Sequence, residues 1–199
     1  MKKLVAVTVF VGLGLIGSIA NANTITPTPT PTILGAGPYT WDYSVTLEGN
    51  SSINAGDFFT IFDFYGFTGA GGVTTPAGWS FTSANTGVCG PFSATDQSAF
   101  CTANDSPAVP NLTWTYTGAG ITQPGGTTLL GHFIATSTQN LPALDGWVSR
   151  DNNNLTGDAD AGASGNTAVP RTVPEPASLF LLGSGLLGLA RARSRRARK

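Results

Sequence analysis

The chain has 199 residues, and its ten Lys and Arg residues nearly balance eleven Asp and Glu residues, so the formal net charge at pH 7 is −1. The charges are unevenly distributed along the chain. Between Thr24 and Pro170 only Arg150 is basic, while the same span holds nine Asp and one Glu. An acidic span with one cation is a poor ligand for phosphates and for anionic membrane surfaces. These features exclude a nucleic-acid-binding protein, and the length suits a single domain.

The N-terminus has the pattern of a secretory signal peptide. Lys2 and Lys3 precede an uncharged apolar run over residues 4–20, and Ala20 and Ala22 supply the small residues that a cleavage site needs. We therefore expect residues 1–22 to form a signal helix that signal peptidase removes after Ala22. An uncleaved N-terminal anchor is the alternative, because a run of 17 residues approaches membrane-spanning length.

A β-rich domain is predicted over residues 33–149. It follows residues 23–32, which read NTITPTPTPT and predict an extended Thr/Pro spacer. Residues 39–48 alternate apolar and polar side chains, which is typical of a half-buried strand. Further strands are predicted over residues 57–65 (a central strand), 79–82, 112–116, 128–136 and 143–149. Gly and Pro interrupt nearly every helical window, so the pattern predicts one antiparallel all-β sandwich, of which a jelly roll is one version.

The two cysteines, Cys89 and Cys101, are predicted to form a disulfide, because an even count in an exported chain is typical of one. A zinc site is excluded, since two thiols and one histidine cannot supply four ligands. Ser93 and Asp96 fit a capping-box pattern inside this loop, which predicts a turn or two of helix there.

Residues 150–172 are mostly small and polar and predict a flexible linker. Oxygen donors of the kind that Ca²⁺ prefers recur at Asp151, Asn153, Asp158 and Asp160. The spacing does not suit a calcium loop, because Leu155 and Thr156 stand where a ligand and a glycine are needed. The prediction is therefore a solvated acidic segment, with no metal and no cofactor.

The C-terminal end, residues 173–199, combines a short proline-stiffened motif, an apolar run over residues 177–190 and a basic tail over residues 191–199. The motif is Val173, Pro174, Glu175 and Pro176, and the cations of the tail are Arg191, Arg193, Arg195, Arg196, Arg198 and Lys199. A helix of 14 residues is about 21 Å long. A hydrocarbon core is about 30 Å thick, so this transmembrane helix is a marginal anchor, and the clustered cations hold its end in the cytoplasm.

Motif, helix and tail together resemble a PEP-CTERM sorting signal of Gram-negative bacteria. The resemblance covers residues 173–199 only. It implies that an exosortase, a membrane enzyme, recognises Pro174, Glu175 and Pro176 and then removes or replaces the helix and tail. An ordinary C-terminal anchor preceded by a chance Pro-Glu-Pro is the alternative.

Candidates for catalysis or ligand binding are sparse in the domain. His132 is the single histidine and lies in a strand pattern, without the nucleophile elbow that would support a Ser-His-Asp set, so we interpret it as structural. Eight Trp and Tyr side chains are interpreted mainly as core. They are Trp41, Trp79, Trp114, Trp147, Tyr39, Tyr43, Tyr65 and Tyr116.

The sequence therefore predicts an exported, exosortase-processed protein of the cell envelope or extracellular matrix, with a non-enzymatic β-rich domain. The predicted partners are the exosortase, signal peptidase and, transiently, the inner membrane, with extracellular polysaccharide as a further candidate. A carbohydrate-binding module that uses exposed aromatic side chains is the first alternative, and a secreted hydrolase is the second.

Overall fold

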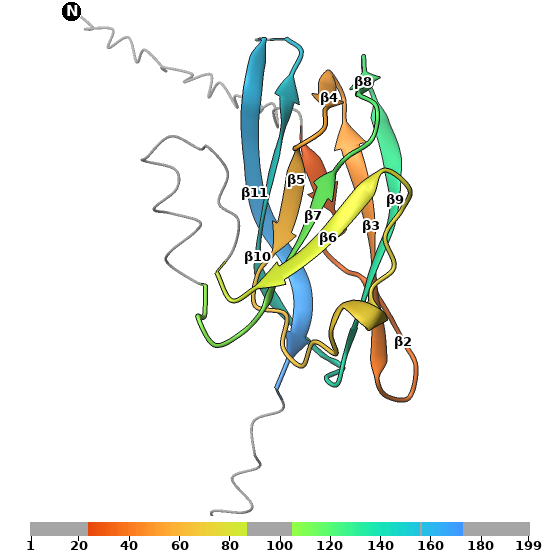
Figure 1. Cartoon of the computed structure of the whole chain (residues 1–199), viewed down its shortest axis with the longest axis vertical. Coiled ribbons are helices and arrows are strands. Elements are labelled where there is room, and N and C mark those ends of the chain that lie inside the picture. Colours follow the sequence, from red (N-terminus) through yellow and green to blue (C-terminus); the bar gives the residue numbers. More distant parts are fainter. Residues whose placement is uncertain (1–23, 87–104, 156, 173–199) are drawn as a thin grey trace, which may run out of the picture.

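The strands of the domain form two antiparallel sheets (Figure 1). The computed structural model describes residues 24–86, 105–155 and 157–172. Within these ranges the chain is built of strands and one 3-10 turn at Ala70–Gly72, so the predicted all-β antiparallel fold is confirmed. The predicted signal helix, the capping-box helix, the disulfide and the C-terminal helix all lie outside the described residues. The jelly-roll variant stays a prediction.

The smaller sheet is centred on β3 (Tyr39–Glu48). One edge of β3 pairs with both β1 (Ile25–Pro27) and β2 (Thr32–Leu34), and the other edge pairs with β9 (Thr127–Ser137). The larger sheet contains β4 (Ser51–Ile53), β5 (Phe58–Ile61), β6 (Trp79–Ala84), β7 (Asn111–Tyr116), β8 (Ile121–Gln123), β10 (Leu141–Asn153) and β11 (Asp158–Arg171). In this sheet β5 lies between β7 and β10, as expected of a central strand.

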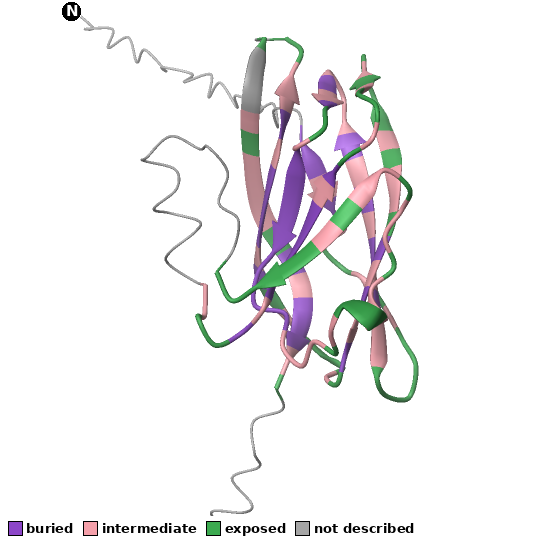
Figure 2. Ribbon diagram, in the orientation of Figure 1, coloured by how far each residue is buried: buried purple, intermediate pink, exposed green. Residues whose placement is uncertain are grey.

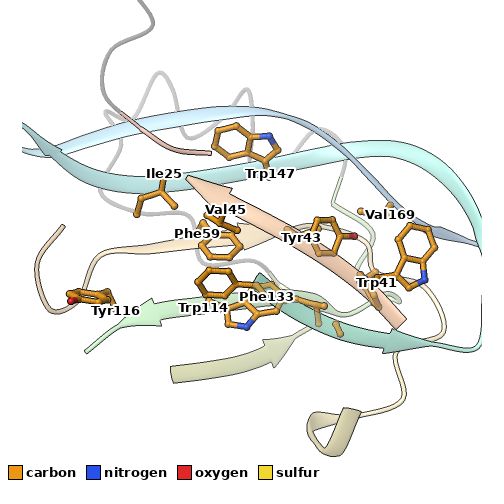
Figure 3. Packing of buried hydrophobic residues seen from close by; sticks show 14 of the residues in the cluster. Ile25, Trp41, Tyr43, Val45, Phe59, Trp114, Tyr116, Phe133, Trp147 and Val169 are labelled. Carbon is orange, nitrogen blue, oxygen red and sulfur yellow. The ribbon is translucent and has the colours of Figure 1, made fainter. Parts of the chain in front are cut away.

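One hydrophobic core holds the two sheets together. The period-two pattern of β3 places Trp41, Tyr43, Val45 and Leu47 in the interior, where none has exposed surface. The larger sheet contributes Phe59, which stacks on Trp114 with ring centroids 5.1 Å apart. Phe133 from β9 meets the Phe59 ring edge-on at 4.9 Å, so aromatic contacts bridge the sheets (Figure 3). The strand β5, which carries Phe59, is buried along its whole length (Figure 2). Each such large apolar side chain contributes about 1.5–3 kcal/mol on burial.

The prediction of a Thr/Pro spacer over residues 23–32 is wrong for its described part. Ile25 to Pro27 pair with β3, and Ile25 is fully buried in the core. The backbone of Thr28 donates to Ser44 O at 2.9 Å. Proline cannot donate to a neighbouring strand, but Pro27 lies on an edge strand, where that loss is tolerated.

The prediction of a flexible linker over residues 150–172 is also wrong. β10 continues to Asn153, and β11 pairs with it from Asp158 to Arg171. The small side chains of β11 suit the packing: a Cβ atom at Gly165 would lie only 2.9 Å from the ring of Trp147. The folded domain therefore begins at Thr24 and continues to the residues just before the C-terminal motif, well beyond the predicted limits of 33–149.

Candidate functional site

The aromatic side chains form core rather than a binding platform. Trp41, Trp114 and Tyr43 have no exposed surface, and Trp147 and Tyr116 are 6% exposed. The remaining Trp and Tyr residues are half-buried. Within the described chain, therefore, every Trp and Tyr is buried or half-buried.

His132 lies on the solvent-facing side of β9 and pairs with an acid on β3. Its Nδ1 atom is 3.0 Å from Asp42 Oδ1 and 3.2 Å from Oδ2, and the imidazole is 56% exposed. Ser44 is the residue directly opposite His132 on β3, but the described residues include no hydrogen bond between them. An Asp-His pair on an open sheet face excludes no water, and this favours the interpretation of His132 as a structural residue.

A polar cavity of about 410 Å³ lies where β5, β10 and β11 meet. We call it the base pocket. Its lining residues are Asp63, Tyr65, Ser106, Leu144, Asp145, Gly146, Asn166 and Arg171. They come from the loop after β5, from the segment before β7, from the first half of β10 and from the second half of β11. The pairing of β10 with β11 brings the lining residues of these two strands together. In this pairing Leu141 lies opposite Arg171, and Asp145 lies opposite Thr167.

Two carboxylates and one guanidinium set the electrostatics of the base pocket. Arg171 Nη2 forms an ion pair with Asp145 Oδ2, and its guanidinium carbon lies 5.0 Å from the centre of the Tyr65 ring. Burial raises the pKa of Asp145, while the backbone N–H of Gly146 and the charge of Arg171 oppose that rise. The pocket is therefore polar, with the carboxylates of Asp63 and Asp145 and the single guanidinium of Arg171 in its lining.

Asp63 is held in an unusual conformation at the rim of this pocket. Its φ angle is +50°, in the left-handed region that Asp tolerates better than most residues. Its N–H donates to Asn111 Oδ1 at 2.8 Å, and its Oδ1 accepts from the N–H of Ser106 at 3.0 Å. Burial raises the pKa of Asp63, the Ser106 hydrogen bond lowers it, and the charge of Asp145 raises it further. These contacts fix an acid at the pocket, a role that the sequence pattern does not signal.

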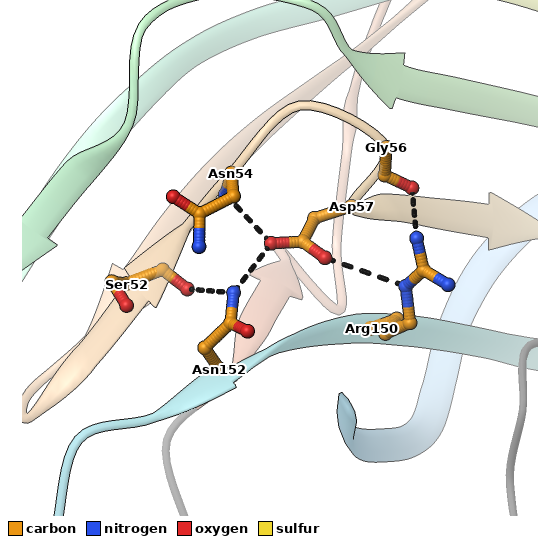
Figure 4. A network of polar contacts seen from close by, with 6 residues as sticks. All are labelled: Ser52, Asn54, Gly56, Asp57, Arg150 and Asn152. Atoms are coloured by element: carbon orange, nitrogen blue, oxygen red, sulfur yellow. Dashed lines mark hydrogen bonds and ion pairs between the residues drawn. The ribbon is translucent and has the colours of Figure 1, made fainter. Parts of the chain in front are cut away.

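A second polar network lies at the opposite end of β10 (Figure 4). Asp57 Oδ1 is 3.3 Å from Arg150 Nε, and Asp57 Oδ2 accepts from the N–H of Asn54 at 2.7 Å and from Asn152 Nδ2 at 2.8 Å. The Arg150 guanidinium also donates to the carbonyl of Gly56 and lies 5.3 Å from the Phe58 ring centre. Burial raises the pKa of Asp57, and these hydrogen bonds and the Arg150 charge lower it. The network pairs the charge of Asp57 with that of Arg150 inside the fold, so it holds the end of β10 against the segment before β5.

The oxygen donors considered for calcium do not form a loop. Asp151 and Asn153 lie in β10, while Asp158 and Asp160 lie in β11. Asp151 is fully buried, so it is not a ligand on the surface of a hairpin. In the part of the chain that the structure describes, no group of three His, Cys, Asp or Glu side chains could hold a metal ion.

The comparisons with known proteins concern the C-terminal end of the chain. Residues 172–196 match the PEP-CTERM protein-sorting motif. No curated protein and no solved structure matches the sequence. The motif confirms the predicted resemblance, and it supports exosortase processing, export and a surface or extracellular location after processing.

The sorting motif and the other predicted processing residues lie outside the described residues. These residues are Ala20, Ala22, Cys89, Cys101, Val173, Pro174, Glu175, Pro176 and the basic tail. Among residues 24–86, 105–155 and 157–172, no helix has the length and apolar character that a membrane crossing requires. What the structure adds is the junction, because β11 ends at Arg171 and the matched motif begins at Thr172.

Proposed function

We propose that this chain is an exported protein of a Gram-negative cell envelope or extracellular matrix, matured at both ends, whose β domain acts without catalysis. Signal peptidase would remove residues 1–22, and an exosortase would act at Pro174, Glu175 and Pro176. The observation that carries the proposal is the sorting motif, which begins directly after the last residue of β11. The acidic charge of the domain supports a role outside the cell that does not involve nucleic acid.

The intact mass of the exported protein tests the processing step. We expect a product that begins at Asn23 and lacks the residues beyond the region of Val173 to Ala177. The two glutamates of the chain offer a matched pair of variants. Glu175→Gln should slow C-terminal processing, whereas Glu48→Gln, in the folded domain, should not. A mature protein that retains Lys199 in a host with an exosortase would contradict the proposal.

A carbohydrate-binding role is the second candidate, and the base pocket favours it over the predicted aromatic platform. The pocket offers Asp63, Asn166 and Arg171 as hydrogen-bonding groups, with Tyr65 as an apolar wall. The affinity of the protein for oligosaccharides on a glycan array should then fall at least about tenfold in Asp63→Asn. This factor corresponds to the loss of one charged hydrogen bond. Asn tolerates the same φ angle, so that variant is expected to fold. Equal binding by both proteins would remove this candidate.

The absence of catalysis is itself a testable part of the proposal. An ester-hydrolysis assay of the mature protein should give no turnover above the buffer rate. Turnover that disappears in His132→Ala would instead support the secreted hydrolase, with Asp42, His132 and Ser44 as its residues.

A further inference from the structure

The strand β11 forms one edge of the larger sheet, and its backbone groups point alternately toward β10 and away from it (Figure 1). The N–H of Phe62 donates to the carbonyl of Gly146 at 3.0 Å, so Gly146 faces β5. In an antiparallel strand both backbone groups of one residue point to the same side, and the side changes at each residue. Asn166, which lies opposite Gly146, therefore does not bond to β10. By the same alternation, the N–H and C=O groups of Gly162, Ser164 and Asn166 point outward.

The contacts of Ala168, the next residue in this series, agree with the alternation. Its N–H donates to the carbonyl of Pro29 and its C=O accepts from the hydroxyl of Tyr43, both at 2.9 Å, so both groups point away from β10. From Gly162 to Asn166, by contrast, the outward groups have no hydrogen-bond partner in the part of the chain that the structure describes. Both of these end residues are exposed, so the edge is open to a partner strand.

This edge lacks the features that normally keep sheet edges apart. Natural proteins protect edge strands with Lys, Pro, bulges or very short strands. The strand β11 has 14 residues, and residues 161–169 contain neither a charged side chain nor a proline. Other edges in the described chain are shorter or covered: β1, β2, β4 and β8 have three residues each, β6 has six, and Thr68 and Thr74 bond to the outer edge of β9. The long, neutral edge of β11 is therefore the one best suited to pair with another strand.

The chemistry of the edge favours a second copy of this chain over a foreign peptide. Domains that bind a peptide by strand addition obtain specificity from pockets for alternate side chains. Residues 161–165 are Ala, Gly, Ala, Ser and Gly, whose side chains are too small to form the walls of such pockets. A second copy needs no pocket, because a two-fold axis at Ser164 pairs the edge with itself in the antiparallel direction. Gly162 then lies opposite Asn166 of the second copy, and no charged side chain faces another between these positions.

We propose that the edge of β11 from Gly162 to Asn166 is a self-association site, through which two copies of the domain join their larger sheets. Every outward N–H of one copy donates to an outward carbonyl of the other. The contact ends where Pro29 covers Ala168, so it is short, and short interfaces are typical of weak, transient association. The acidic charge of the two domains opposes their approach, so added salt should strengthen the dimer. The proposal is independent of processing at either end of the chain.

Hydrogen exchange of the exported protein, resolved by residue in NMR spectra, tests the proposal. The amides of Ala161, Ala163 and Gly165 should exchange slowly at every protein concentration, because they bond to β10. The three outward amides should exchange at least about tenfold more slowly as the concentration rises from about 30 μM to about 1 mM. Exchange that does not depend on concentration would overturn the proposal. Outward amides that are already slow in dilute solution would overturn it too, since another segment of the chain would then cover the edge.

Two variants at Ser164 distinguish this edge from any other dimer contact. In Ser164→Pro the lost N–H is one that points outward, so the pairing with β10 is retained. Ser164→Lys keeps the backbone intact but brings two added cations together across the two-fold axis. Sedimentation equilibrium should give a dissociation constant at least about tenfold higher in both variants than in the wild type. Ser80→Lys adds the same charge at an exposed residue opposite Thr115 of β7, and it should dimerise as the wild type does. A dimer that is equally stable in the two Ser164 variants would overturn the proposal.

Discussion

The buried acid on β10 makes a quantitative prediction about stability and pH. Burial raises the pKa of Asp151 to about 7, Ser51 beside it lowers the pKa, and the charge of Asp57 raises it. The same carboxyl in the unfolded chain has a pKa of about 3.9. Between these two values the folded state holds one more proton than the unfolded state.

The free energy of unfolding must therefore fall as the pH rises through this window. The slope approaches about 1.4 kcal/mol per pH unit, and over roughly three units the loss amounts to about 4 kcal/mol. The stability is fully present below the unfolded pKa and is lost by the time the pH passes the folded pKa. Asp151→Asn keeps the shape of the side chain but cannot ionise, so this variant should lack that slope.

Urea denaturation at pH 5, 6, 7 and 8 measures the effect. The wild-type chain and its Asp151→Asn variant are compared at each pH, and the difference between them isolates the titration of Asp151 together with its coupling to Asp57. Asp63 and Asp145 also have raised pKa values, but they lie at the base pocket and contribute equally to both chains. Parallel pH profiles for the two chains would refute the reasoning.

Three further substitutions probe the packing by urea denaturation. Phe133→Ala removes a fully buried ring that bridges the sheets and should cost about 3–5 kcal/mol. Gly165→Ala should cost about 1–3 kcal/mol, because its Cβ atom meets the Trp147 ring at 2.9 Å, whereas Gly125→Ala, with nothing within 4 Å, should change little. Tyr43→Phe should cost about 1 kcal/mol, because it removes the 2.9 Å hydrogen bond that joins β3 to β11. Unchanged stability in any of the three disruptive variants would show that the contact contributes nothing.

The strands that were predictable share one physical property. Residues 39–48 bury every second side chain, so their period is visible in the sequence. Residues 112–116 alternate apolar and polar side chains in the sequence, although the structure buries Thr113 as well. The strand β11 has no such period, because its side chains are mostly small and Gly165 accommodates the ring of Trp147. Its pairing with β10 is formed by backbone hydrogen bonds, which do not depend on the type of side chain. A polar, glycine-rich composition therefore looked like a linker although it forms an edge strand.

The base pocket could not be predicted for a related reason. Asp63 and Arg171 are far apart in the sequence, and only the pairing of β10 with β11 brings the Arg171 side chain to Asp145 and Tyr65. The charge composition was the one signal in the sequence. In a domain with two arginines and many acids, each arginine is expected to form an ion pair with an acid. That rule predicts ion pairs for Arg150 and Arg171, but it does not identify the acid.

The two ends of the fold set the distance between the predicted processing junctions. Thr24 lies beside Ser149 of β10, and Arg171 at the end of β11 lies opposite Leu141, so the two junctions are separated along β10 (Figure 1). The eight residue steps from Leu141 to Ser149 span about 27 Å. Asn23 alone separates the predicted cleavage after Ala22 from the described residues, and the matched motif begins at Thr172, directly after β11. The two predicted processing steps would therefore act on junctions that are separated along the length of the larger sheet.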